Sequence, residues 1–502
     1  MPATTDEATD IKLHRNLSVW EAIGISLALM APSMAASINP QGTATTVGRA
    51  VPVAFALAFV GVLLVAYTFV RLTQRFHHSG SVYGFVGATL GPRAGMISGW
   101  ALAGTYIFYA VTTAMAGGRF LAGFFSSTGI WKDAATLNWP GFLLGAIGLG
   151  LIWWLATAPA RGGTRILLAA EGITVALILI VIVIVFAKLA GHSGPGKLGL
   201  TGSAFSLPSG TPLSTLFLGV VFGFLSFAGF EAASTLGEET KRPNRDIPRA
   251  ILGVAIFGGI YFVVVTAVES MGFGTSAAGV KAFINSPSLI GNLGSMYVSS
   301  WIGNIITLGA MVSAFSCALA CVVGASRLIF ALGRDGILPG SLGHVSPSRR
   351  TPTYSTGAVV LAAYVIIAFT WFVLRGSPFG LFLEAGTIGT LILLVVYVMA
   401  TVGMSKLVFF SGQRSVRNWE IVIPILGVIV LGYTLFRNIY PFPSGSAWWG
   451  PLTALVWLVV GLLYAVIRSG AASRAGQLLT QAEGLSGQPA AVTVQAAAGP
   501  AA

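Results

Sequence analysis

Residues 223–237 read Gly-Phe-Leu-Ser-Phe-Ala-Gly-Phe-Glu-Ala-Ala-Ser-Thr-Leu-Gly, and this stretch decides how the chain is interpreted. It lies in an apolar run, 213–237, that is long enough to cross a bilayer, since a spanning helix needs about 20 residues. Glu231 nevertheless stands near the middle of the run, closely preceded by Ser226 and Gly229. A carboxylate at this depth costs about 2.5–3.5 kcal/mol, so it should face a cavity or a partner. The stretch therefore predicts an interrupted membrane helix with a functional acid at the interruption.

The composition places the whole chain in a membrane. Charged residues make up 9% of the 502 residues and apolar residues 55%, with a mean hydropathy of +0.84. Ordinary globular proteins have about 25% charged residues, and so few charges could not cover a surface that faces water. The net charge of +13 comes from basic residues in short connectors rather than in a stripe, which argues against nucleic-acid binding. Cys317 and Cys321, the two cysteines, share one apolar run and exclude a disulfide framework.

Twelve apolar segments are long enough to span the bilayer, and they predict an all-α polytopic membrane protein. They are 20–47, 51–71, 94–123, 140–158, 165–190, 213–237, 248–271, 297–332, 353–374, 380–405, 420–437 and 448–467. With the N-terminus inside, the cytoplasmic connectors hold 20 of the 28 Lys and Arg residues and the other side holds 8, which predicts that both termini are cytoplasmic. The polar ends, 1–17 and 469–502, are predicted to be disordered.

The first span carries a second interruption. Pro32 stands inside 20–47, where it removes a backbone donor and should break or kink the helix. The sixth span crosses the membrane in the opposite direction to the first. Matched interruptions in two inverted halves indicate a transporter binding site. The alternative is that Pro32 makes an ordinary kink and that the glycines allow close helix packing.

Glu231 permits three interpretations. It could contact the ammonium group of a substrate, or it could bind a proton, since burial favours the neutral acid. It could instead accept hydrogen bonds from backbone donors that the helix break sets free.

Other polar residues in the spans are weaker candidates. For Glu171 and Glu269, near the ends of their spans, interfacial solvation or a local ion pair is expected. Glu384 receives more weight as a coupling residue because the Ala-Gly-Thr-Ile-Gly-Thr stretch after it is small and polar enough to line a cavity. Tyr106 and Tyr109 in span three are candidates for substrate contact, with aromatic packing as the alternative.

Sodium and enzymatic chemistry have little support in the sequence. Ser313 and Ser316 could coordinate Na⁺ together with carbonyls freed in span one, but hydroxyls more often bond back to their own helix. All five histidines stand outside the spans, and no HExxH or GxxxxGK[ST] motif occurs. We therefore expect no metal, no cofactor and no enzymatic activity. No arginine-periodic span or TVGYG-like filter supports a channel, which leaves transport driven by a gradient.

The connector 238–249 holds seven charged residues in twelve positions. Mixed signs predict local ion pairs in a solvated loop, with a cytoplasmic gate as the alternative. Pro248 is expected to start span seven, since proline is favoured at the first helical position.

Several of these motifs resemble the amino acid–polyamine–organocation (APC) family of permeases. The motifs are Ser226-Phe-Ala-Gly-Phe-Glu231, Glu238-Glu-Thr-Lys-Arg-Pro243, Arg245-Asp-Ile-Pro-Arg-Ala-Ile251, Ala325 to Pro339, Arg350-Thr-Pro352 and Ser79-Gly-Ser-Val-Tyr83. The likeness covers roughly residues 18–470. It implies a leucine-transporter-type fold, in which 18–405 form five plus five inverted spans with helices 1 and 6 broken, and 406–468 add two spans.

The resemblance also implies where a small amino acid or amine would bind. The amine-facing side would consist of Ser226, Phe227, Ala228, Gly229, Phe230 and Glu231, where half-helix carbonyls attract a cation. The opposite side would consist of Ala31, Ser33, Met34, Ala35 and Ala36. Many members have a Gly-Ser-Gly run here whose amides hold the substrate carboxylate, but this chain has Ala31-Pro32-Ser33, and proline offers no amide. The amides of residues 33–36 could still bind an anion. Polyamine-type members share the Met-x-Pro pattern, so a substrate without a carboxylate is the alternative.

Together these arguments predict a secondary permease of the cytoplasmic membrane. Its leading substrate is an amino acid, with a polyamine or another organic amine as the alternative, and a transporter-like receptor as the competing class. Coupling to protons through Glu231 is expected in preference to sodium. The oligomeric state is left open.

Overall fold

The computed structural model describes residues 17–76, 82–158, 163–237, 239–346, 349, 351–410, 416–443, 445–468 and 470. Apart from residues 17 and 470, the two ends predicted to be disordered lie outside the described residues. So do five residues of the motifs quoted above: residues 79–81, Glu238 and Arg350.

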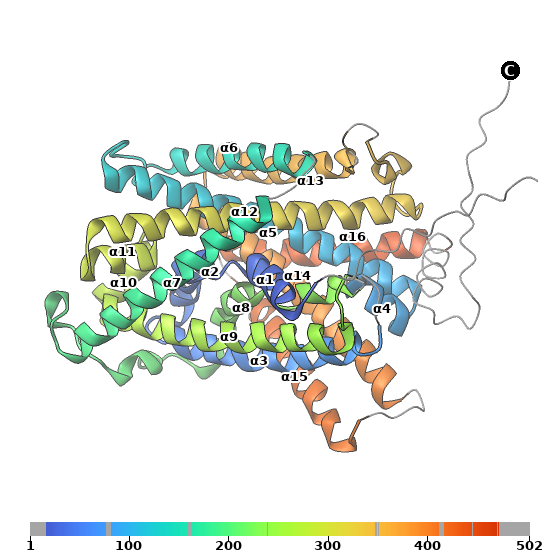
Figure 1. The fold of residues 1–502 in the computed structure, drawn as a ribbon, viewed down its shortest axis with the longest axis horizontal. Helices are drawn as coiled ribbons and strands as arrows, with labels where there is room; N and C mark the ends of the chain where they lie inside the picture. The colour runs from blue at the N-terminus through green and yellow to red at the C-terminus, as the bar shows by residue number, and fades with distance from the viewer. Residues whose placement is uncertain are drawn as a thin grey trace, which may run out of the picture.

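The described part of the chain is helical, with no β-strand and with twelve segments long and apolar enough to cross a membrane (Figure 1). The spans are α1 (Val19–Met30) with α2 (Pro32–Val47), α3 (Val51–Thr73), α5 (Pro92–Thr128), α6 (Asn138–Thr157), α7 (Gly163–Ala190), α8 (Leu216–Phe227) with η4 (Ala232–Leu236), α9 (Pro243–Phe273), α12 (Ser300–Arg334), α13 (Thr353–Ala368) continued by η6 (Phe369–Val373), α14 (Pro378–Phe409), α15 (Val422–Ile439) and α16 (Trp449–Ile467). Every predicted span is confirmed, and most boundaries agree within a few residues.

The boundary of span seven was predicted wrongly. Helix α9 begins at Pro243, and Pro248 lies inside it instead of starting it. Both prolines fall near the N-terminus of the helix, and Pro243 has already taken the favoured first position.

Short helices also occur in connectors for which the hydropathy pattern predicted no helix. They are α4 (Val82–Leu90), α10 (Ala277–Asn285) and α11 (Leu289–Tyr297), each only 9 residues long.

The helices pack as two related sets of five. Helix pairs that occupy equivalent places in spans 1–5 and 6–10 lie against each other: α2 with α8, α3 with α9, α5 with α12, and α6 with α13. In Figure 1, α1 and α2 lie between the α3/α9 pair and the α5/α12 pair. Helices α15 and α16 pack on the outside of this core, against α3, α5, α8 and α14. The packing agrees with the expected five plus five arrangement with two added spans.

Both predicted helix breaks are present. Helix α1 ends at Met30, and α2 starts at Pro32 after Ala31, which adopts a left-handed conformation with φ of +47°. Such a conformation is uncommon for a residue with a side chain. In the sixth span, α8 ends at Phe227, and the chain passes through four non-helical residues before η4. Pro32 therefore does more than kink its helix.

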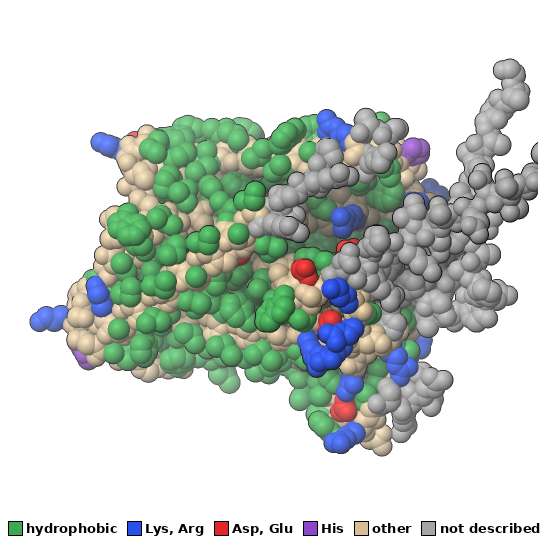
Figure 2. Space-filling model, viewed as in Figure 1, with side chains coloured by type: hydrophobic (Ala, Val, Ile, Leu, Met, Phe, Trp, Pro, Cys, Tyr) green, Lys and Arg blue, Asp and Glu red, His purple; other side chains and the backbone are tan. Residues whose placement is uncertain are grey.

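Hydrophobic side chains cover the middle of the visible face, whereas Lys, Arg, Asp and Glu gather toward its ends (Figure 2). The helices on the outside of the bundle carry the exposed large apolar residues, such as Ile180 and Val183 of α7 and Leu462 and Leu463 of α16. This distribution is expected for helices that face lipid.

Candidate functional site

The first helix break is held open by side chains from three other helices. The backbone N–H of Ser33 donates to Glu171 Oε1 on α7 at 2.8 Å, and that of Met34 donates to Ser313 Oγ on α12 at 3.3 Å. The carbonyl oxygen of Leu29 accepts from Cys317 Sγ on α12 at 3.1 Å. Farther along, Tyr261 of α9 donates its hydroxyl to the carbonyl of Pro32 at 3.4 Å. Backbone groups that the break removes from the helix ladder thus find partners inside the protein, as burial in a membrane requires.

The second break is closed by its own acid. Gly229 has φ of +103°, and its N–H donates to Glu231 Oε2 at 3.2 Å. Glu231 is buried, with 5% of its surface exposed. The third interpretation of Glu231, as an acceptor for freed backbone donors, therefore describes one of its contacts.

The two broken helices are also bonded to each other. Asn39 Nδ2 of α2 donates to Ser226 Oγ of α8 at 2.8 Å, and the N–H of Ala233 in η4 donates to Ser26 Oγ of α1 at 3.0 Å. Leu17, just before α1, forms an isolated bridge with Thr240 after η4. The halves of the two spans are therefore joined in pairs: α1 with η4, and α2 with α8.

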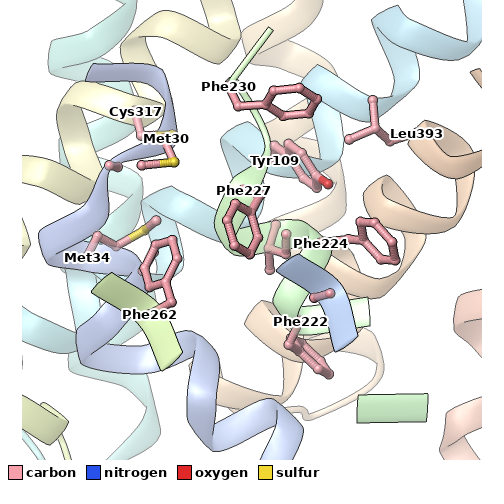
Figure 3. Packing of buried hydrophobic residues seen from close by; sticks show 14 of the residues in the cluster. Met30, Met34, Tyr109, Phe222, Phe224, Phe227, Phe230, Phe262, Cys317 and Leu393 are labelled. Carbon is pink, nitrogen blue, oxygen red and sulfur yellow. The ribbon is translucent and has the colours of Figure 1, made fainter. Parts of the chain in front are cut away.

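A small internal cavity lies where the two breaks meet. It is lined by Leu29, Met30, Met34, Thr105, Tyr106, Tyr109, Thr113, Leu225, Ala228, Gly229, Glu231, Cys317, Cys321 and Leu393. Glu231 is the single acidic residue of this lining. The cavity offers about 20 Å³ to water-sized groups, which is room for about one water molecule. Figure 3 shows Met30 and Met34 on the first broken helix, facing Phe227 and Phe262. In this structure the protein is closed tightly around the site.

The structure brings six of the predicted substrate-binding residues to the cavity wall: Met34, Tyr106, Tyr109, Ala228, Gly229 and Glu231. Ala31 supplies the left-handed turn of the first break, and Ser33, Ala35 and Ala36 are buried in the first turns of α2 outside the lining. Tyr109 is fixed by a hydrogen bond of 3.0 Å with Thr390.

Three other predicted binding residues have structural partners. Ser226 donates to the carbonyl of Phe222 at 2.8 Å in its own helix. Phe227 packs on Phe59 and Phe262. Phe230 packs on Phe69 and Tyr397. These residues shape the second break from behind the lining.

The residues predicted to couple transport to an ion do not lie together in the structure. Ser313 lies at the first break, whereas Ser316 donates to the carbonyl of Val312 in its own helix at 2.7 Å. Glu384 lies near the start of α14, partly exposed and outside the cavity lining. Of the acids and hydroxyls proposed for coupling, Glu231 and Ser313 are therefore the two at the helix breaks.

Two acids were placed wrongly by the sequence analysis. Glu171 was expected to be solvated or ion-paired near the membrane surface, but it is 9% exposed and binds the backbone of Ser33. Glu269 is fully buried in α9, and neither carboxylate oxygen has a hydrogen-bond partner in the described part of the protein. A position near the end of a span does not place Glu269 at the membrane surface, because α9 continues to Phe273 and carries Glu269 inside the bundle.

Comparison with known proteins identifies the family. The sequence model of a family described as amino acid permease matches residues 17–471. The chain belongs to the amino acid permease family. This confirms the resemblance to APC permeases, and the protein is a secondary transporter that crosses the membrane many times.

Similar proteins include permeases with different substrates in their names. The branched-chain amino acid permease BcaP of Bacillus subtilis is 25% identical over 86% of this chain and 89% of its own. The low-affinity putrescine importer PlaP of Escherichia coli is 24% identical over 72% of this chain and 76% of its own. The methylthioribose transporter of Bacillus subtilis is 23% identical over 90% of this chain and 92% of its own.

Proposed function

We propose that this permease imports an amino acid with an apolar side chain, and that import is coupled to protons. The observation that carries the proposal is the cavity at the two helix breaks, which combines one carboxylate, Glu231, with an otherwise largely apolar wall. An ammonium group would be attracted by Glu231 and by carbonyls at the end of α8. Leu29, Met30 and Leu393 suit an aliphatic side chain, and the similarity to a branched-chain amino acid permease supports this substrate class.

A second candidate substrate is an organic amine without a carboxylate. Pro32 has no N–H to offer, and the N–H of Ser33 is already bonded to Glu171. The similarity to a putrescine importer supports this candidate. A thermal-shift comparison of matched pairs separates the two: leucine against 3-methylbutylamine, and ornithine against putrescine. A ligand of the folded state raises the melting temperature by mass action. Stabilisation by the amines alone would contradict the amino acid assignment.

Glu231 is proposed to bind the ammonium group of the substrate. The Glu231→Gln variant keeps the shape of the side chain and an acceptor for the N–H of Gly229, so it should fold. We expect uptake of the amino acid into proteoliposomes to fall at least tenfold. Full uptake by this variant at every pH would remove the proposed role. A receptor, in contrast, would bind the ligand but show no uptake in the wild-type protein.

We further propose that both termini face the cytoplasm of the cell whose membrane holds the permease. The uneven distribution of Lys and Arg supports this orientation. A single cysteine placed in the tail of a Cys317→Ser, Cys321→Ser background should react with an impermeant thiol reagent only after the cells are opened.

A further inference from the structure

The N-terminus of α2 is an anion site that the protein fills with its own carboxylate. A helix N-terminus presents free N–H groups and a partial positive charge, which together bind anions. In α2, Pro32 has no N–H, so that of Ser33 is the first available donor, and Glu171 Oε1 accepts it at 2.8 Å. The next donor, Met34, is taken by Ser313, and Ala35 donates to the carbonyl of Ala31 at 2.9 Å. The bond to Glu171 is therefore the anionic contact at this helix end.

The surroundings of Glu171 offer hydroxyls and backbone rather than counter-charges. Its carboxylate lies beside the hydroxyls of Ser313 and Ser33, and Tyr261 on α9 is the titratable side chain that interacts with it. Helices α1, α2, α11 and α12 also pack on α7, but no charged side chain of the described residues acts on this carboxylate. The hydroxyl oxygen of Ser33 is fully buried and has no hydrogen-bond partner in the described part of the chain. One unsatisfied oxygen thus lies in the first turn of the same helix.

A substrate carboxylate would need the place that Glu171 holds. Two carboxylates that share one site repel each other, so one of them must be protonated or leave. A proton on Glu171 removes its charge and weakens its hold on the N–H of Ser33, while the ammonium group of the same substrate stays near Glu231. Met34 lines the cavity one residue after Ser33, so this helix end is next to the proposed substrate.

We propose that the start of α2 is a carboxylate-exchange site, in which protonation of Glu171 frees the N–H of Ser33 for the carboxylate of the substrate. Each carboxylate-bearing substrate then enters with one proton on Glu171, and that proton leaves when Glu171 returns to Ser33 after substrate release. An amine without a carboxylate leaves the bond between Glu171 and Ser33 in place and needs no such proton. This inference rests on the amino acid transport proposed above.

The first test measures binding of leucine and 3-methylbutylamine to the full-length protein between pH 5.5 and 7.5. Leucine affinity should rise as the pH falls, by up to tenfold per pH unit, which is the limit for one linked proton. The affinity for the amine should change less than twofold. In Glu171→Gln, where the side chain stays neutral, leucine should bind with the same affinity across this range.

A matched control is Glu269→Gln, which makes the same substitution at another buried acid. Glu269 lies eight residues after Tyr261 on α9, about 12 Å along the helix from the contact with Pro32. This variant should keep the pH dependence of the wild-type protein. Melting curves without ligand establish that both variants are folded, and Glu171→Asp provides a shorter acid that should restore part of the pH dependence.

The second test measures transport. In proteoliposomes, a pH gradient should drive leucine accumulation by the wild-type protein, whereas Glu171→Gln should exchange leucine for leucine and accumulate at least tenfold less. Equal pH slopes for leucine and the amine, or an unchanged slope in Glu171→Gln, would overturn the exchange site while amino acid transport stands. Binding of the amine alone at every pH would overturn both proposals.

Discussion

Replacing Gly229 with alanine tests whether contact between the two helix breaks is essential. Gly229 has φ of +103°, and a Cβ atom added there would lie 2.8 Å from Leu29 Cγ, 2.9 Å from Leu29 Cβ and 3.1 Å from its carbonyl carbon. Leu29 lies in the last turn of α1, so the substitution pushes the end of α1 away from the second break. Two costs arise: about 1–3 kcal/mol for the strained backbone and about 1–3 kcal/mol for overpacking.

The total of about 2–6 kcal/mol is large for a single residue. Even its lower limit changes the folding equilibrium constant about thirtyfold. The variant should melt at a temperature several degrees lower in detergent. Uptake should fall at least tenfold, because the N–H of Gly229 also orients Glu231. Thermal unfolding and proteoliposome uptake measure the two effects separately.

Gly253→Ala is the control for this prediction. Gly253 lies in α9 on an exposed position, and an added Cβ atom meets nothing within 4 Å. Alanine is favoured over glycine in a helix, so this variant should be as stable as the wild-type protein or slightly more stable. If Gly229→Ala has the same melting temperature and the same uptake as Gly253→Ala, the contact between Gly229 and Leu29 is not essential for stability or transport.

Two further predictions concern contacts across the broken helices. A double-mutant cycle of Asn39→Ala and Ser226→Ala, measured by unfolding, should give a coupling free energy of about 0.5–1.5 kcal/mol, because this is the net value of a hydrogen bond. A coupling free energy near zero would show that the 2.8 Å contact does not join α2 to α8. Cys317 and Cys321 line the cavity, so a small cationic thiol reagent should inhibit uptake. Bound substrate should protect the two cysteines from the reagent, and the variant with both cysteines replaced by serine should keep its uptake. Inhibition that persists in that variant would place the reactive site elsewhere.

The helix breaks could be predicted because their signals are local. Pro32 stands inside an apolar run and cannot continue the hydrogen-bond ladder, whatever surrounds it. Gly229 and Glu231 give the second break a backbone that tolerates positive φ and an acid that lipid would not accept. Both features are properties of a few adjacent residues, so one sequence was enough to place them within the spans.

The role of Glu171 could not be predicted in this way. Its partner, Ser33, lies 138 residues earlier, and nothing near Glu171 in the sequence identifies that residue. The position of Glu171 along its span suggests the membrane surface, whereas the packing of α7 against α2 and α12 decides its burial. The burial of Glu269 could not be predicted for the same reason, because the position of a residue along a helix does not show which other helices pack over its side chain.

The closed cavity indicates which of its lining residues must move when a substrate binds. About 20 Å³ cannot hold an amino acid, so the lining has to move. Tyr109 is fixed by its hydrogen bond to Thr390, whereas Met30 and Met34 have unbranched side chains with three rotatable bonds. Both methionines stand next to the first break: Met30 is the last residue of α1, and Met34 lies in the first turn of α2, whose N-terminal site Glu171 occupies. Space for an aliphatic side chain and a place for the substrate carboxylate would therefore open at the same helix break, and both depend on movement at Ala31.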